Sequence, residues 1–117
     1  FKEYPDFFCL PTQDKNIVTG WLSYPILINS KSNINRSDLQ VYLEKKDVQT
    51  RPIFTGNLLR HPMMKNKIYK KVTNSFTNSD FVMKNGILIG CHQGLSKREV
   101  DYVTRQIINF LKSKKFI

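Results

Sequence analysis

The sequence predicts a single α+β domain in which a small three-stranded sheet, antiparallel or mixed, carries helices on one face. Three observations support this fold class. The chain has 117 residues, which is the usual size of one domain. Hydrophobic residues make up 40% of it, enough for a core and too many for a disordered chain. Segments of strand composition alternate with segments of helical periodicity, in the order strand, helix, strand, irregular segment, helix, strand, helix.

The three strands are predicted from composition. Residues 17–28 are rich in β-branched and aromatic residues, with Gly20 and Pro25 as irregular or edge positions. Residues 48–54 form a second, short strand. Residues 87–91 are apolar throughout, which indicates a third strand buried on both faces.

Two of the helices are predicted from their ends. Asn35 is a natural N-cap for a helix over residues 36–46. Ser79 is expected to cap a shorter helix that runs to Asn85, and Gly86 stops it. The stretch between the second strand and this helix is predicted to be irregular.

The third helix has the strongest local signal. Ser96 and Glu99 have the spacing of a capping box, in which each side chain satisfies a free backbone N–H of the first turn. One apolar stripe follows at helical spacing, formed by Val100, Val103, Ile107 and Leu111.

Residues 1–15 contain Pro5 and Pro11 among aromatic residues. They predict an irregular connecting arm that lies over another surface, and residues 16–117 form the domain.

Charge and cysteine content restrict the function classes. The net charge is +10, and residues 48–84 hold seven basic side chains against one acid, Asp80. Such a cluster attracts phosphate, either in nucleic acid or in a nucleotide ligand. Cys9 and Cys91 are too few for a disulfide framework and are interpreted as reduced thiols of a cytoplasmic protein. The longest apolar run, residues 24–28, is far short of a membrane span, so no membrane partner is expected.

Motifs for catalysis are missing from the sequence. It has no glycine-rich nucleotide loop, no metal-binding cluster, no nucleophile motif and no paired carboxylates, so neither a catalytic residue nor a metal site is predicted.

Residues 49–62 are the segment most typical of a binding site. A strand ends in an arginine and a proline, and a glycine, an asparagine, an arginine and a histidine follow. Arginine forks suit phosphate or carboxylate, although an ordinary loop with a paired arginine explains the residues equally well.

The segment TRPIFTGNLLRHP (residues 50–62) resembles a motif of the DegT/DnrJ/EryC1/StrS family of fold-type I pyridoxal-phosphate enzymes, which act on nucleotide-linked 4-keto-6-deoxysugars. Other segments resemble the family in the same order and spacing. They are LP at residues 10–11, WLSYPI at 21–26, VQTR at 48–51, NSDFVM at 78–83, and IGCHQGL at 89–95 with DYV at 101–103. The resemblance therefore runs along almost the whole chain.

The resemblance implies the C-terminal small domain of an enzyme whose large cofactor-binding domain is absent from this sequence, so that this chain alone is inactive. It implies PLP or PMP in the intact enzyme, a nucleotide-diphosphate sugar as substrate, a homodimer, and a role in deoxy- or aminosugar biosynthesis of the lipopolysaccharide type. GNLLRHP is most similar to the 3-dehydratase branch, with an aminotransferase as the alternative. The implied substrate-binding residues are Arg51, Asn57, Arg60 and His61, together with Gln49, His92 and Gln93. The family often has glutamate where this chain has Gln49, which leaves the exact substrate open.

Two alternatives remain beside the enzyme domain. A stand-alone basic module for nucleotide or nucleic acid would bind mixed oligonucleotides in a salt-dependent way. The aromatic RNP signature and the GxxG loop are absent, which argues against nucleic acid. A structural fragment that docks on a missing partner would expose a sizeable apolar patch, and this alternative is compatible with the enzyme domain.

Overall fold

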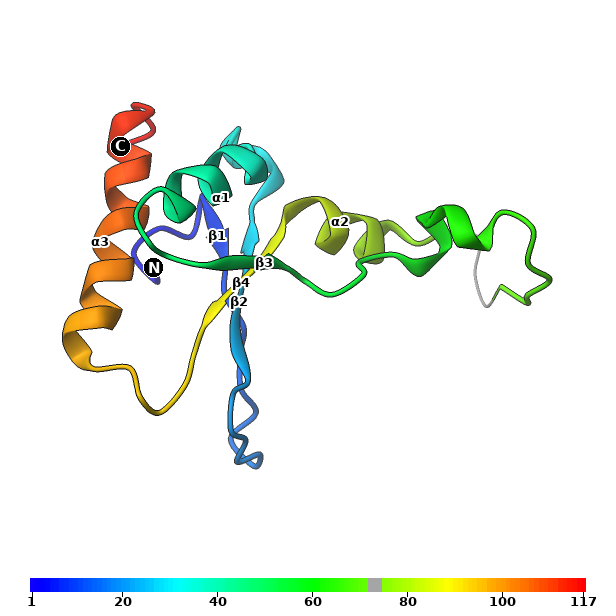
Figure 1. The fold of residues 1–117 in the computed structure, drawn as a ribbon, viewed down its shortest axis with the longest axis horizontal. Coiled ribbons are helices and arrows are strands. Elements are labelled where there is room, and N and C mark those ends of the chain that lie inside the picture. Colours follow the sequence, from blue (N-terminus) through cyan, green and yellow to red (C-terminus); the bar gives the residue numbers. More distant parts are fainter. Residues whose placement is uncertain (72–74) are drawn as a thin grey trace.

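The computed structural model describes residues 1–71 and 75–117, and it confirms the α+β class (Figure 1). The strands are β1 (Phe8–Cys9), β2 (Ser23–Ile28), β3 (Thr50–Pro52) and β4 (Gly86–Gly90), and they form one antiparallel sheet in the order β1-β2-β4-β3. The helices are α1 (Arg36–Glu44), α2 (Thr77–Asn85) and α3 (Lys97–Ser113), with short 3-10 turns at Ser30–Ser32, Leu58–Arg60 and Pro62–Met64.

The sheet has a fourth strand that the sequence did not predict. β1 comes from the N-terminal arm, where Phe8 pairs with Ile28 of β2. The arm is therefore part of this domain's own sheet, and its aromatic side chains pack on the domain's own core. β2 is shorter than predicted, because residues 17–22 form a loop with exposed aliphatic side chains. Pro25 lies in the part of β2 that pairs with β4 but not with β1. On the β1 side it is therefore at an edge, as expected for a residue that has no N–H to donate.

The helix ends depend on their caps. Asn35 Oδ1 accepts hydrogen bonds from two backbone N–H groups of α1, at 2.8 and 3.2 Å, as predicted. The capping box of Ser96 and Glu99 at the start of α3 is also confirmed. The cap predicted at Ser79 is wrong, because α2 begins two residues earlier at Thr77, without a side-chain cap. Gly86 ends α2 as expected, and it also starts β4.

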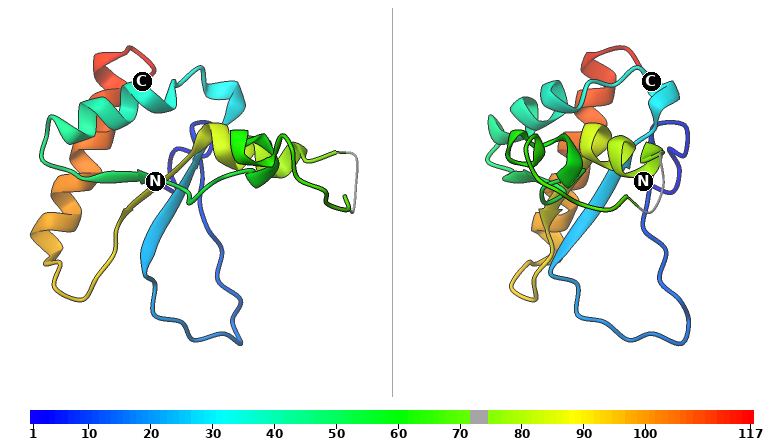
Figure 2. Two further views of the ribbon diagram at one scale, coloured as in Figure 1. Left: turned by 45° about the vertical axis from the view of Figure 1, so that its right-hand side comes forward. Right: turned by 90° about the vertical axis from the view of Figure 1, so that its right-hand side faces the viewer.

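The core lies between one face of the sheet and the two helices α1 and α3 (Figure 2). Ile26 of β2 is opposite Ile87 of β4, and both point to this face with Phe8 and Ile28. The buried side chains on the helices are Leu39 and Leu43 of α1 and Ile107, Phe110 and Leu111 of α3. The predicted stripe of α3 thus enters the core at Ile107 and Leu111, while its first member, Val100, is half exposed.

The opposite face of the sheet is only partly covered. β4 was expected to be buried on both faces, but only Gly86 and Ile87 are buried, Leu88 and Ile89 are half-buried, and Gly90 is exposed. Ile53 and the end of α2 cover Gly86, whereas a Cβ atom built on Gly90 meets nothing within 4 Å. The Gly90 end of this face is therefore open.

Replacing each of the two glycines of β4 by alanine should change the stability of the domain differently. At Gly86 a Cβ atom would lie 2.7 Å from the backbone oxygen of Val82 and 2.6 Å from Ile53 Cδ1. Because the backbone cannot yield freely, Gly86→Ala should lower the free energy of unfolding by about 1–3 kcal/mol. Gly90→Ala should be neutral or stabilise by up to about 1 kcal/mol. Hydrogen exchange of the β4 amides measures both, and equal effects would contradict the description of an open Gly90 end.

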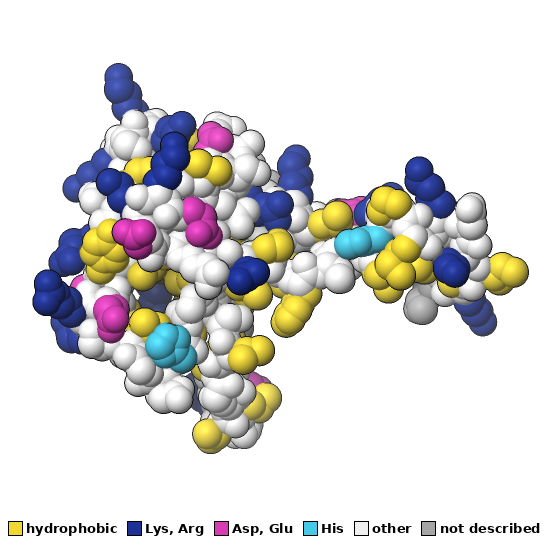
Figure 3. All heavy atoms as spheres, viewed as in Figure 1, with side chains coloured by type: hydrophobic (Ala, Val, Ile, Leu, Met, Phe, Trp, Pro, Cys, Tyr) yellow, Lys and Arg dark blue, Asp and Glu magenta, His cyan; other side chains and the backbone are white. Residues whose placement is uncertain are grey.

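Two segments project from the body, namely residues 10–22 and residues 53–71 (Figures 1 and 2). The radius of gyration is 16.2 Å, against about 13 Å for a compact domain of this length. Apolar side chains appear on the surface of both segments (Figure 3). Among the described helices, none has the length and apolar character needed to span a membrane.

Candidate functional site

Arg51 lies on the open face of the sheet. β3 pairs with β4 so that Thr50 is opposite Ile89 and Arg51 is opposite Leu88. Thr50 is buried and faces the helices, and its neighbour Arg51 is exposed on the other side, because side chains alternate along a strand. Leu88 is also on the open face, next to the unfilled space above Gly90. The guanidinium group can therefore be reached by a ligand over this face.

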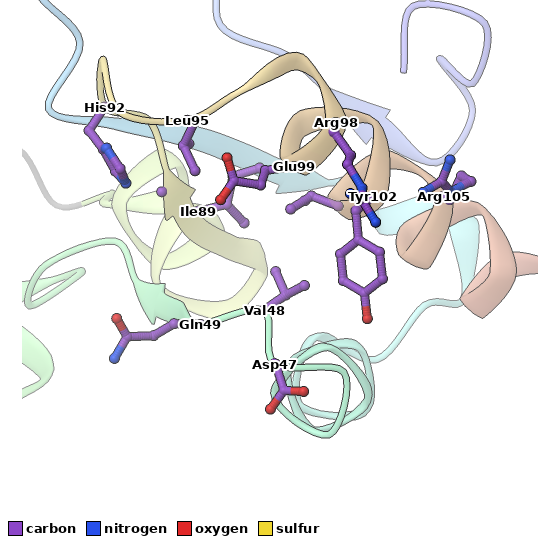
Figure 4. Close-up of a pocket in the computed structure, with 12 residues that line it drawn as sticks. Asp47, Val48, Gln49, Ile89, His92, Leu95, Arg98, Glu99, Tyr102 and Arg105 are labelled. Carbon is purple, nitrogen blue, oxygen red and sulfur yellow. The ribbon is translucent and has the colours of Figure 1, made fainter.

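Gln49 and His92 border the same cavity although they are far apart in the sequence. Both line a cavity of about 570 Å³ between the start of β3, the end of β4 and the first turns of α3 (Figure 4). The other lining residues are Asp47, Val48, Ile89, Gly90, Leu95, Arg98, Glu99, Tyr102, Val103 and Arg105. His92 Nδ1 accepts a hydrogen bond from the backbone N–H of Gly94 at 3.2 Å, which orients the ring. Gln93 is exposed beside it and is not among the lining residues.

The GNLLRH loop lies elsewhere, on the projecting segment. Asn57 is only 4% exposed, and both ends of its amide group are engaged within the chain. Its Nδ2 donates to Asp80 Oδ1 at 2.7 Å, and its Oδ1 accepts from the N–H of Leu59 at 3.1 Å, capping the turn at Leu58–Arg60. The asparagine therefore stabilises the loop and does not offer its amide to a ligand.

Arg60 is held by the same acid. Its Nε and Nη2 atoms donate to the two oxygens of Asp80, at 2.9 and 2.6 Å, in a bidentate ion pair. His61 Nε2 lies 2.6 Å from the carbonyl oxygen of Thr55 and donates to it, which closes the turn. The polar groups of this loop thus hold the loop itself together. Both arginines are exposed, but Arg60 is paired with Asp80, whereas Arg51 has no ion-pair partner among the described residues.

Asp80 is the residue that the sequence did not propose for the site. It lies in the first turn of α2, twenty or more residues after its partners. One signal could have identified it, because it is the single acid among the basic residues of the 48–84 stretch. A lone carboxylate in such a stretch is expected to pair with one of the arginines.

The Asp80 contacts predict a pH dependence. Hydrogen bonds from Arg60 and Asn57 lower the pKa of Asp80 from 3.8 to about 2. A carboxyl with a lowered folded-state pKa stabilises the fold fully above its unfolded value and stops doing so as pH falls through its folded value. Between pH 3.8 and about 2, the loop should therefore lose protection from hydrogen exchange in the native protein. Asp80→Asn should remove that pH dependence, and equal pH profiles for the two proteins would contradict the assignment.

The cavity does not fit pyridoxal phosphate. Enzymes of this cofactor hold it through a lysine and a charged partner at the ring nitrogen. The cavity has Arg98 and Arg105 for a phosphate, but none of its described lining residues is a lysine. Glu99 already accepts two hydrogen bonds from Ser96, which lower its pKa. No group of three metal-binding side chains occurs within the described ranges either.

The match to known proteins runs along most of the chain. The sequence pattern of the DegT/DnrJ/EryC1/StrS aminotransferase family matches residues 1–108. The chain belongs to this family. The resemblance seen in residues 50–62 is thereby confirmed.

The relatives of this family member include 3-dehydratases. The lipopolysaccharide biosynthesis protein RfbH of Salmonella typhimurium is 32% identical over 105 residues, which is 90% of this chain and 24% of that protein. The dTDP-4-dehydro-2,6-dideoxy-D-glucose 3-dehydratase of Saccharopolyspora spinosa is 29% identical, over 87% of this chain and 22% of that protein. A solved GDP-4-keto-6-deoxymannose-3-dehydratase with a trapped PLP-glutamate geminal diamine superposes with a TM-score of 0.76, at 27% identity over 91% of this chain and 28% of that one. The chain thus spans about a quarter of the length of these relatives.

Proposed function

We propose that residues 16–117 are the C-terminal small domain of a PLP- or PMP-dependent enzyme that converts nucleotide-linked keto-deoxysugars, and that residues 1–15 are a connecting arm that adds β1 to the sheet of this domain. The reaction is a 3-dehydration, with amination as the alternative. One observation carries the proposal: proteins named as 3-dehydratases match almost nine-tenths or more of this chain, while the chain spans about a quarter of each. The bound cofactor would supply the electron sink for the sugar chemistry, and the rest of the polypeptide would hold it.

The substrate contacts of this domain are proposed for the open face and for the cavity between α3 and the strands β3 and β4. Arg51 can donate two parallel hydrogen bonds to the diphosphate of the nucleotide sugar, since it is exposed on the open face. Gln49 and His92, which line that cavity, can donate to phosphate oxygens and can donate to or accept from sugar hydroxyls. Asn57, Arg60 and His61 act in this proposal as positioning residues that shape the loop following Arg51.

The intact enzyme is proposed to be a cytoplasmic homodimer of lipopolysaccharide-type sugar biosynthesis. Two findings support the compartment and the pathway. Cys9 and Cys91 are both free thiols, which is usual in reducing compartments. The match to RfbH, a lipopolysaccharide biosynthesis protein, supports the pathway.

The test is a product assay on the complete polypeptide. The purified protein would be supplied with PLP, glutamate and GDP-4-keto-6-deoxymannose, and in parallel with the dTDP-linked sugar. Mass spectrometry distinguishes a product in which hydrogen replaces the 3-hydroxyl, so that one oxygen is lost while glutamate is oxidised to 2-oxoglutarate and ammonia is released, from one in which an amine replaces the keto oxygen. We expect the 3-deoxy product. Failure to bind or convert either nucleotide sugar, together with salt-dependent binding of mixed oligonucleotides, would contradict the proposal and favour a basic binding module.

A further inference from the structure

We propose that Glu44, the last residue of α1, is a positioning residue that fixes the start of β3 and thereby places Gln49 and Arg51 for the nucleotide sugar. This inference rests on the proposed function, because it assumes that these two side chains bind that substrate. Glu44 lies outside the segment of residues 49–62, and its carboxylate reaches β3 from the end of the helix.

The carboxylate of Glu44 binds Thr50 through two hydrogen bonds. Its Oε1 atom accepts one from the backbone N–H of Thr50 at 2.6 Å and one from the Thr50 hydroxyl at 3.0 Å. Gln40, one turn earlier in α1, donates to the same hydroxyl at 3.2 Å. Hydrogen bonds to an ionised acceptor are the stronger kind. Because Thr50 is 8% exposed, both its backbone and its side chain are held by α1.

These contacts take the place of a further strand beside β3. β3 is the last strand in the order β1-β2-β4-β3, so the N–H groups on its outer side need acceptors from elsewhere. The N–H of Val48 donates to the carbonyl oxygen of Leu43 at 3.0 Å, and that of Thr50 donates to Glu44. Pro52 follows two positions later on the same side and has no N–H to satisfy. The end of α1 therefore determines where β3 begins.

Thr50 lies between the two residues of β3 and its approach that are proposed to bind the substrate. Gln49 borders the cavity, and Arg51 is exposed on the open face. The connection from α1 is also held from α3, because the Tyr102 hydroxyl donates to the carbonyl oxygen of Lys46 at 3.0 Å (Figure 4). The backbone that carries both side chains is thus ordered before any ligand binds. Such preorganisation lowers the cost of binding.

Steady-state kinetics of the complete polypeptide test this role, with GDP-4-keto-6-deoxymannose or the dTDP-linked sugar as the varied substrate. Glu44→Ala should raise KM about 5- to 20-fold and change kcat by less than about twofold, because it loosens residues that bind the substrate. Glu44→Gln keeps an acceptor oxygen for Thr50 and should restore most of the loss. Hydrogen exchange at the Thr50 amide, measured without substrate, should be about tenfold faster or more in Glu44→Ala.

Asp38→Ala is the matched control. Asp38 is another acid of α1, and its carboxylate faces Lys114 of α3 at 3.7 Å. Both alanine variants remove one negative charge from the same helix, which by itself would favour binding of an anionic diphosphate. A rise in KM that occurs only in Glu44→Ala therefore reports the lost contact with Thr50.

A double variant distinguishes positioning from general destabilisation. In an enzyme that already carries Arg51→Ala, Glu44→Ala should raise KM by less than about twofold. The inference is overturned if the two losses multiply, if Asp38→Ala raises KM as much, or if Glu44→Gln is as impaired as Glu44→Ala. Any of these results in an active enzyme leaves the proposed function intact. A wild type that converts neither nucleotide sugar would instead contradict the proposed function, and the inference with it.

Discussion

Arg51→Ala in the complete polypeptide is expected to lower kcat/KM for the nucleotide sugar by about 10- to 100-fold. The reason is the position of Arg51 on the open face, where its planar group can bind a diphosphate through two charge-assisted hydrogen bonds. Arg51→Lys keeps the charge and loses the fork, so it should fall between the wild type and alanine. Steady-state kinetics with the accepted sugar measure all three.

Arg60→Ala is the control that the same motif offers. Arg60 is bound to both oxygens of Asp80, so its removal should disturb the loop and cost much less in kcat/KM than the loss of Arg51. Thermal unfolding should be unchanged in Arg51→Ala, because that side chain is exposed. Equal kinetic losses for the two arginines would contradict the division of roles proposed here.

Phe110→Ala is expected to lower the free energy of unfolding of this domain by about 3–5 kcal/mol. Phe110 is 1% exposed, lies between the sheet and α1, and meets the ring of Tyr42 edge-on at a centroid distance of 5.4 Å. Its truncation leaves a cavity where helix and sheet surfaces meet. Hydrogen exchange of α3 amides in the complete polypeptide measures the effect on this domain alone.

The matched change is Val100→Ala in the same helix. Val100 is 50% exposed, so its truncation should alter the free energy of unfolding by less than about 0.5 kcal/mol. Similar losses at both positions would mean that α3 does not pack on the sheet as described.

Local signals explain which elements could be predicted from the sequence. The capping box at Ser96 involves residues three positions apart, so it can be predicted from the local sequence alone. β1 is different, because its two residues form a strand only through pairing with β2, some twenty positions later. Ser79 failed as a cap because the backbone had already begun α2 at Thr77. Short strands and helix starts of this kind depend on tertiary contacts that composition does not reveal.

In the candidate site, too, the residue types could be predicted from the sequence and their contacts could not. The sequence placed Arg51 and Arg60 in one motif with similar roles, and the structure separates them because Asp80 on α2 binds only the second. It also brings Gln49 and His92 to one cavity through the pairing of β3 with β4. The sequence thus indicates which residues are candidates for the site. Which groups they contact depends on the register between β3 and β4 and on the position of α2.

The most direct test of the central claim is the intact mass and absorbance spectrum of the protein from its native source. If this chain is the small domain of a larger enzyme, the subunit should be about four times as long as the chain, like the relatives it matches. It should also carry a pyridoxal or pyridoxamine chromophore. A native product of 117 residues without a chromophore and without affinity for nucleotide sugars would contradict the claim.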